Sequence, residues 1–351
     1  MKTHLALIIS ALTISLGALL IAGCGDNSSS NSGPTASGGA KQLLVGVVFD
    51  SGGLGDKSFN DSAYRGLQKA EKDLGIKEKT IDSKSEKDYE PNLTAMADAG
   101  CDLVFAIGYS QADALKQVAP KYPNVKFAII DTTVDAPNVR SIVFDEEQGS
   151  FLAGYLAALM DKTGKIGFVG GMTGDLIKKF ESGYRAGALT VNPNIQVTAK
   201  YTESWDDSAL GKAAATVLFS DGADVVYHAA GRCGRGVIDA AKESGKYAIG
   251  VDSDQDDIEP GTVLTSMIKH VDNAVYQTIA DVKDGKFSPG TKRYDLKSEG
   301  VGLSDFKYTK DKIGQANLDK VDKVAEEIKA GKITVPSKLD ELDAYLKTVK
   351  R

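Results

Sequence analysis

The sequence has few of the residues on which several protein classes depend. Its 351 residues include three cysteines, three histidines and one tryptophan. So few cysteines exclude a disulfide-rich scaffold, and no pair of histidines has the spacing of a helical zinc site. Acidic residues number 48 and basic residues 42, and the resulting net charge of −6 disfavours a nucleic-acid-binding protein. Only one long apolar run is present, which disfavours a protein with several membrane spans.

Motifs of common enzyme classes are also lacking. Neither the Gly-x-Ser-x-Gly turn of serine hydrolases nor a Walker A loop occurs. The glycines of Gly231–Gly236 follow the order GxxGxG, whereas a dinucleotide-binding turn has GxGxxG. Cys233 in this loop has no recognisable base beside it. The sequence therefore predicts no catalytic residue, no metal and no cofactor, and it favours a binding protein over an enzyme.

The one long apolar run lies at the N-terminus and is typical of an export signal. Lys2 precedes the apolar stretch, which ends in Ile21-Ala22-Gly23-Cys24. Small residues directly before a cysteine resemble the lipobox of bacterial lipoproteins. The resemblance implies that Cys24 is the lipid attachment site. An ordinary secretory signal with an incidental cysteine is the alternative. We expect residues 1–23 to be a signal peptide that is removed.

Residues 24–41 predict a lipidated, flexible tether. The stretch Gly25–Ala40 contains no large apolar side chain and is rich in Gly, Ser and Asn, a composition that buries nothing. We expect a monomeric body that a palmitate-type lipid anchor holds at the extracytoplasmic face of a bacterial cell membrane.

From Leu43 onward, apolar runs alternate with helical periodicity. Leu43–Asp50 is an almost continuous apolar run, as buried parallel strands require, and helical spacing follows between Phe59 and Leu74. Further strands are expected at Leu103–Gly108, Phe127–Asp131, Ile142–Asp145, Lys165–Gly170, Val225–Ala229 and Tyr247–Asp252. Strands and helices in this order predict an α/β fold with parallel sheets.

The α/β pattern starts again after residue 145, which predicts two similar lobes. The expected first lobe is 42–145 plus about 266–290, and the expected second lobe is 146–265 plus about 291–351. Val263–Ile268 is expected to be a strand that crosses back to the first lobe. A chain that crosses more than once forms a hinge, and hinged lobes suit closure around a ligand.

Several of the expected strands end in an acidic residue or a glycine that begins a loop. These residues are Asp50, Gly108, Asp131, Gly231 and Asp252. In open α/β sheets, ligands bind beyond the carboxyl ends of the strands. The sequence therefore predicts a ligand site that is assembled from many strand ends.

Six strings in the chain carry a family resemblance. They are Asp50-Ser-Gly-Gly-Leu-Gly-Asp-Lys-Ser-Phe-Asn-Asp61, Ala106–Tyr109, Phe180–Gly187, Ala229–Lys242, Gly250–Gln255 and Val263–Val275. Together they resemble the basic membrane protein family, substrate-binding lipoproteins of ABC transporters that are similar to the purine nucleoside receptor. The matches extend from residue 43 to about 305.

This resemblance implies both a fold and a function. The implied fold is the type I periplasmic-binding fold, with two doubly wound parallel-sheet lobes and a hinge of several crossings. The implied ligand is a purine nucleoside of the adenosine, guanosine or inosine class, and the implied partner is an ABC permease.

The resemblance places Phe59 and Phe180 at the two faces of the purine. Stacking on an aromatic ring is worth about 1–3 kcal/mol per base. Both residues also fit a simpler interpretation, because each shares a helical face with apolar neighbours and could belong to the core.

Polar residues are expected at the edge of the base and at the ribose. Asn60 and Asp131 offer acceptors to the N–H groups of a base, although Asp131 could instead serve a turn. Asp252, with Asp50 as the second candidate, could accept from two ribose hydroxyls, as an acidic residue does in dinucleotide folds. Lys269 could donate to the hydroxyl oxygens or be a solvated lysine.

Gly231 would allow a close approach of the backbone to the sugar, because it has no Cβ atom. In the loop that follows, the chain departs from the family pattern, because Arg232 and Arg235 flank Cys233. Arginines in a glycine-rich loop could hold an anion such as a nucleotide phosphate, or they could face solvent. The alternatives in function are therefore a binding protein for a sugar, a nucleotide or a signalling molecule, or a surface enzyme that processes nucleosides.

Overall fold

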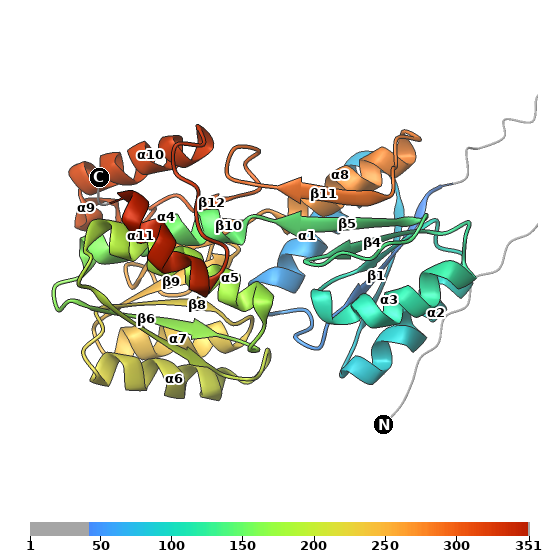
Figure 1. The fold of residues 1–351 in the computed structure, drawn as a ribbon. Helices are drawn as coiled ribbons and strands as arrows, with labels where there is room; N and C mark the ends of the chain where they lie inside the picture. The colour runs from blue at the N-terminus through green and yellow to red at the C-terminus, as the bar shows by residue number, and fades with distance from the viewer. Residues whose placement is uncertain (1–41, 350–351) are drawn as a thin grey trace, which may run out of the picture. The chain divides into compact units, whose positions relative to one another are not determined.

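The computed structural model describes residues 42–349, and these residues form two α/β lobes, each built on one six-stranded sheet (Figure 1). The expected signal peptide, Cys24 and the expected tether lie outside the described residues. Between residues 42 and 349, no helix has both the length and the apolar character that a membrane span requires.

The sheet of the first lobe has the strand order β11-β5-β4-β3-β1-β2, and all of its strands are parallel. Its strands are β1 (Leu44–Phe49), β2 (Lys77–Asp82), β3 (Leu103–Ala106), β4 (Lys126–Ile130), β5 (Val139–Phe144) and β11 (Gly290–Tyr294). The central strands are buried almost throughout, which explains their continuous apolar sequences.

The sheet of the second lobe has the order β12-β10-β9-β8-β6-β7. Its strands are β6 (Lys165–Gly170), β7 (Gln196–Tyr201), β8 (Val225–Ala229), β9 (Tyr247–Asp252), β10 (Val263–Lys269) and β12 (Val301–Leu303). Only β12 runs antiparallel to its neighbour, β10.

Each lobe carries its own set of helices around its sheet (Figure 1). On the first lobe they are α1 (Phe59–Leu74), α2 (Tyr89–Asp98), α3 (Ala112–Val118) and α8 (Val271–Lys283), with the short 3₁₀ turns η1 (Glu86–Asp88), η2 (Tyr109–Gln111) and η3 (Ala119–Lys121). On the second lobe they are α4 (Glu146–Met160), α5 (Asp175–Val191), α6 (Ser208–Ser220), α7 (Cys233–Glu243), α9 (Lys310–Ile313), α10 (Gln315–Lys329), the 3₁₀ turn η4 (Leu339–Glu341) and α11 (Leu342–Val349).

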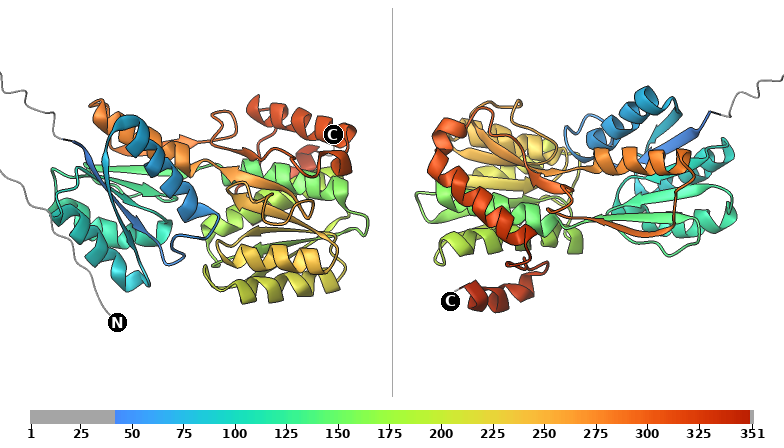
Figure 2. Two further views of the ribbon diagram at one scale, coloured as in Figure 1. Left: turned by 180° about the vertical axis from the view of Figure 1, so that it is seen from behind. Right: turned by 90° about the horizontal axis from the view of Figure 1, so that it is seen from above.

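The chain passes between the lobes three times, as the expected hinge requires. It crosses after β5, after β10 and again between β11 and β12. After the second crossing, α8 packs beside α1 on the first lobe (Figure 2).

The prediction that Val263–Ile268 crosses back to the first lobe was wrong. This segment is β10, which pairs with β9 and β12 inside the second sheet, and the crossing follows at His270. The return to the second lobe comes after Tyr294, close to the expected bound of about 290, because β11 is an edge strand of the first sheet. Its sequence is polar, and an edge strand that is exposed on both faces leaves no apolar signal.

Helices α4 and α5 approach each other closely, and three glycines allow it. A Cβ atom on Gly154 would lie 1.9 Å from Tyr184 O, and one on Gly187 would lie 2.0 Å from Phe151 O. A Cβ on Gly183 would lie 2.1 Å from Glu147 O. This contact sets the first turns of α4 against the second half of α5.

We expect the substitution Gly187→Ala to lower the free energy of unfolding by at least about 2 kcal/mol, because the new methyl group would overlap a backbone carbonyl. Gly302→Ala is the matched control, since no atom lies within 4 Å of a Cβ there. Urea unfolding of both variants checks this, and an equal midpoint for the two would contradict the packing described.

Candidate functional site

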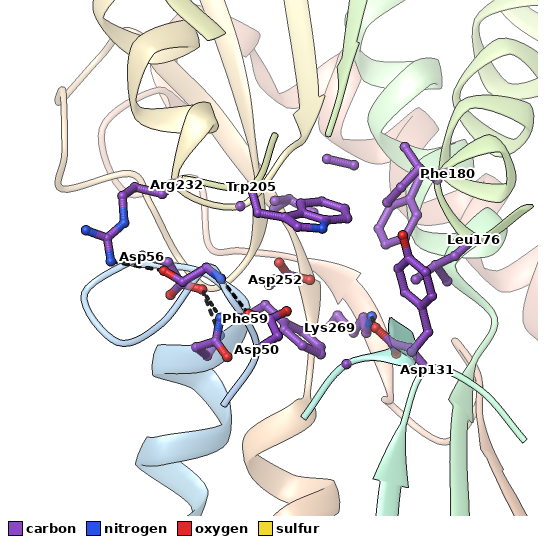
Figure 3. Close-up of a pocket in the computed structure, with 18 residues that line it drawn as sticks. Asp50, Asp56, Phe59, Asp131, Leu176, Phe180, Trp205, Arg232, Asp252 and Lys269 are labelled. Carbon is purple, nitrogen blue, oxygen red and sulfur yellow. Dashed lines mark hydrogen bonds and ion pairs between the residues drawn. The ribbon is translucent and has the colours of Figure 1, made fainter. Parts of the chain in front are cut away.

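A cavity of about 540 Å³, partly open to solvent, lies between the carboxyl ends of the strands of the two lobes. Its lining, drawn in Figure 3, consists of Asp50, Gly52, Asp56, Phe59, Asn60, Gly108, Tyr109, Asp131, Leu176, Ile177, Phe180, Trp205, Ala229, Gly231, Arg232, Val251, Asp252 and Lys269. All eight residues predicted as ligand-binding are among them: Asp50, Phe59, Asn60, Asp131, Phe180, Gly231, Asp252 and Lys269.

Lys269, the last residue of β10, carries a buried charge in this cleft. Its side chain is 2% exposed, and Nζ lies 2.6 Å from Asp131 Oδ2 and 3.4 Å from Glu146 Oε1. Burial disfavours the ammonium, but the carboxylates of Asp131, Glu146 and Asp252 outweigh this effect and raise the pKa of Lys269. The alternative of a solvated lysine is therefore wrong.

Two of the cleft carboxylates sit on strained backbone. Asp131 and Asp252 both adopt the left-handed backbone conformation, with φ values of 73° and 62°. Such conformations cost roughly 1–3 kcal/mol and persist only where other contacts impose them. Asp131 is held by Lys269, and Asp252 accepts a hydrogen bond of 2.6 Å from Ser58 Oγ across the lobes. These contacts keep both carboxylates in the cleft.

Asp50 and Asn60 form a network on the side of the first lobe. Asn60 Nδ2 donates to Asp50 Oδ1 at 2.9 Å and to Asp56 Oδ2 at 3.1 Å. Burial raises the pKa of Asp50 to about 6, although the bond from Asn60 acts in the opposite direction. With its amide nitrogen engaged by both aspartates, Asn60 keeps Oδ1 as an acceptor without a partner among residues 42–349.

Two buried acceptors in the cleft have no hydrogen-bond partner among residues 42–349. They are Asn60 Oδ1 and Asp131 Oδ1. A buried polar atom without a partner costs about 1–3 kcal/mol. A ligand that supplies N–H or O–H groups would satisfy both atoms.

Aromatic rings reach the cleft from both lobes. Phe59 is the first residue of α1 in the first lobe, and Phe180 lies in α5 of the second lobe. The ring centroids of Phe59 and Phe180 lie 5.0 and 5.6 Å from Lys269 Nζ, so the two rings flank the same charge. Phe180 is only 3% exposed and also belongs to the core, and the two interpretations of this residue are therefore compatible.

Several functional candidates escaped the sequence reasoning. Trp205 lines the cavity from the loop after β7 (Figure 3), and it stacks so closely on Gly171 that a Cβ there would lie 2.3 Å from the indole ring. Its status as the only tryptophan was the available signal. Glu146 was missed as well, although the run Asp145-Glu146-Glu147 directly after a strand indicated a cluster of charge.

The two arginines of the glycine-rich loop after β8 lie in different surroundings, and Gly231 lines the cavity beside them. At Gly231, φ is 53° and a Cβ would lie 3.1 Å from Trp205 O, so the backbone itself requires glycine there. Arg235 is half exposed and pairs with Asp239, as expected of a solvent-facing arginine. Arg232 instead lines the cavity and donates to Gly52 O and Leu54 O of the first lobe, at 3.0 and 2.8 Å.

A charged network connects the cleft with the first crossing between the lobes. Lys179 Nζ lies 2.9 Å from Glu146 Oε2 and 3.2 Å from Glu147 Oε2. Asp145, which directly precedes α4, pairs with Arg293 of β11. Glu146 therefore contacts Lys179 with one oxygen and Lys269 with the other, which links the hinge to the ligand site.

Between residues 42 and 349 there is no group of three or more side chains that could hold a metal ion. Cys101 and Cys233 are both buried free thiols, and burial raises the pKa of each thiol.

We expect Lys269→Met to destabilise the protein by about 3–5 kcal/mol at pH 8, because buried carboxylates lose their cation. The deficit should shrink at pH 5. Burial already raises the pKa of Asp131 from 3.8 to about 7, and removal of Lys269 raises it further. A carboxyl with a raised folded-state pKa stabilises the protein at acidic pH, and this stability is lost as the pH rises through that pKa.

Urea unfolding at pH 5 and pH 8 checks this prediction. Lys121→Met, which removes an exposed lysine from a surface pair with Glu90, should leave the midpoint unchanged at both pH values. A Lys269→Met deficit of the same size at both pH values would contradict the assignment of Lys269 as the counter-ion of buried carboxylates.

Comparison with known proteins gives consistent matches. The family model described as "ABC transporter substrate-binding protein PnrA-like" matches residues 43–338. The CD4+ T-cell-stimulating antigen of Listeria monocytogenes is 38% identical over 351 aligned residues, which cover 93% of this chain and 98% of the relative. The ABC transporter nucleoside-binding protein BmpA of Lactococcus lactis subsp. cremoris is 39% identical, with 94% of this chain and 98% of the relative covered.

Among solved structures, an ABC transporter system solute-binding protein from Aeropyrum pernix K1 matches with a TM-score of 0.80 at 29% identity. The match covers 88% of this chain and 97% of that protein. Together with the two parallel-stranded lobes, it confirms the predicted type I periplasmic-binding fold.

Proposed function

This chain belongs to the family of PnrA-like ABC transporter substrate-binding proteins, and we propose that it captures a purine nucleoside in the cleft and delivers it to an ABC permease. Family membership implies a small ligand and a transporter permease as partner. The nucleoside is the finer part of the proposal. The name of the Lactococcus lactis relative, a nucleoside-binding protein, supports it.

One observation carries the choice of ligand. The same cavity combines aromatic rings from both lobes with buried, unpartnered acceptors. The rings are those of Phe59 and Phe180, and the acceptors are Asn60 Oδ1 and Asp131 Oδ1. A purine offers two π faces for the rings, and its edge offers N–H donors for the acceptors. A simple sugar could pack its C–H groups against these rings, but it has no π face to stack between them and no N–H donors for the acceptors.

The remaining polar groups suit a ribose. Asp252 and Lys269 lie on neighbouring strands of the second lobe, and together they offer both an acceptor and a donor to vicinal hydroxyls. The cleft lining contains four carboxylates, on Asp50, Asp56, Asp131 and Asp252, against the cations Arg232 and Lys269. This balance disfavours a phosphorylated ligand, because its charge would meet an excess of acidic groups.

We extend the proposal to location and to chemistry. Cys24 is the proposed lipid attachment site, and residues 24–41 are the proposed tether to the extracytoplasmic face of the membrane. The protein is proposed to bind without chemical conversion of its ligand. Incubation of the protein with adenosine or inosine, followed by chromatography for free base, tests this part, and turnover would contradict it.

We expect calorimetric titration to show one-to-one binding, micromolar or tighter, of at least one of adenosine, guanosine and inosine. The titration uses residues 42–351, and the comparison ligands are ribose, free purine bases and the 5′-monophosphates. Binding of a sugar alone, or of a monophosphate more tightly than its nucleoside, would contradict the proposed ligand class.

Phe59→Leu and Phe180→Leu should each weaken nucleoside binding by at least about 1 kcal/mol, because leucine fills similar space but offers no ring for stacking. Tyr308→Leu is the control, since Tyr308 is an exposed aromatic outside the cleft. Calorimetry on the three variants decides the matter. Unchanged affinity in both phenylalanine variants would show that no flat ring lies between these side chains.

A further inference from the structure

Arg232 is the one cation of the glycine-rich loop that reaches the other lobe. Its Nη2 donates to the carbonyl oxygens of Gly52 and Leu54, at 3.0 and 2.8 Å. Both acceptors belong to the loop between β1 and α1 of the first lobe, whereas Arg232 follows β8 of the second lobe. One guanidinium nitrogen, Nη2, is therefore engaged with backbone carbonyls of the other lobe, whereas the buried Nε has no hydrogen-bond partner among residues 42–349.

The loop between β1 and α1, which accepts the hydrogen bonds from Arg232, is held by hydrogen bonds from its backbone amides to aspartate side chains of the same lobe. Asp50 Oδ1 accepts from Gly52 N, and Asp61 accepts from the amides of Gly55 and Lys57. Asp56 accepts from three further amides at the start of α1. Because these amides are satisfied within the first lobe, the Gly52 and Leu54 carbonyls are free to receive a donor from the second lobe.

Arg232 contacts the first lobe at the end of the cavity that lies away from the hinge. Lys269 and Glu146 lie directly at two of the crossings between the lobes. In Figure 3, Arg232 lies at the end of the cavity opposite to Lys269 and Asp131. A contact far from the hinge has the longest lever arm against opening, so it must break early when the lobes separate.

Arg232 is also tied to an aromatic wall of the cleft. Its backbone N–H donates to Trp205 O at 2.9 Å, and a Cβ on Gly52 would lie 3.7 Å from Trp205 Cβ. Trp205 and Arg232 thus meet the same loop of the first lobe from the same side. Separation of the lobes at this point would expose Trp205 to solvent.

We propose that Arg232 is a positioning residue that latches the loop between β1 and α1 over the cleft and so slows the release of the captured ligand. The latch acts through the loop, which carries Asp50, Gly52 and Asp56 into the cavity lining. It rests on the proposed capture function for its effect on ligand release, but its effect on the lobes themselves needs no ligand.

The experiment therefore begins without ligand and uses Trp205, the only tryptophan of the chain, as the reporter. Acrylamide quenching of its fluorescence is measured in the wild type, Arg232→Ala, Arg232→Lys and Arg235→Ala. Loss of the latch should raise the quenching constant at least about twofold in Arg232→Ala and less in Arg232→Lys, since lysine lacks the planar fork of the guanidinium.

Arg235→Ala removes the same charge from the same segment but leaves the contact between the lobes intact, so its quenching should equal that of the wild type. Circular dichroism and the unfolding midpoint establish that each variant is folded, and Arg232→Lys keeps the test open should Arg232→Ala fail to fold. Equal quenching in the Arg232 and Arg235 variants would overturn the latch.

The second step measures ligand release by stopped-flow fluorescence with whichever nucleoside binds the wild type. We expect Arg232→Ala to raise the dissociation rate about tenfold, as expected for loss of hydrogen bonds to a charged donor, with the association rate nearly unchanged. A loss of affinity that lies in association alone would overturn the latch. If no nucleoside binds the wild type, the proposed ligand fails, while the quenching result still decides on Arg232.

Discussion

A lysine that is almost completely buried must have its charge compensated, and Lys269 meets this requirement by drawing carboxylates from both lobes to one point. Asp131 comes from the end of β4 in the first lobe, and Asp252 and Glu146 come from the second. One ammonium group faces three carboxyl groups, so the carboxyl oxygens can accept further hydrogen bonds. Burial raises the pKa values of Asp131 and Asp252, although the charge of Lys269 acts in the opposite direction. The cleft therefore keeps acceptor oxygens without partners among residues 42–349, such as Asp131 Oδ1, and a ligand with N–H or O–H donors would satisfy them.

This charge cluster also connects the site with the hinge. Glu146 begins α4 directly after the first crossing, and it divides its two oxygens between Lys269 and Lys179. The close glycine-mediated packing of α4 on α5 fixes the position of Phe180 relative to Glu146. At the opposite end of the cleft, Arg232 joins the lobes through backbone carbonyls. Residues that hold the lobes together therefore stand at both ends of the cavity, with the aromatic rings between them.

The sequence was sufficient to predict which strand ends would form the cleft, because the carboxyl ends of parallel strands share one edge of a sheet. All eight predicted residues line the cavity. It was not sufficient for Trp205 or for the partner of Arg232, because loop conformations depend on packing such as that of the indole on Gly171. The strand β11 was missed because a polar edge strand leaves no apolar pattern. The second crossing was placed a few residues too early, because β10 pairs inside its own sheet up to Lys269.

We propose that the cleft binds a purine nucleoside by stacking its base between the lobes and by accepting hydrogen bonds from its donors on carboxylate and amide oxygens. A crystal structure of the protein grown with inosine or adenosine tests this most directly. We expect the base to lie between Phe59 and Phe180, with N–H or O–H donors on Asn60 Oδ1 and Asp131 Oδ1 and with the ribose hydroxyls at Asp252 and Lys269. A nucleoside bound outside this cleft, or a cleft that instead retains a co-purified ligand without a flat ring, would contradict it.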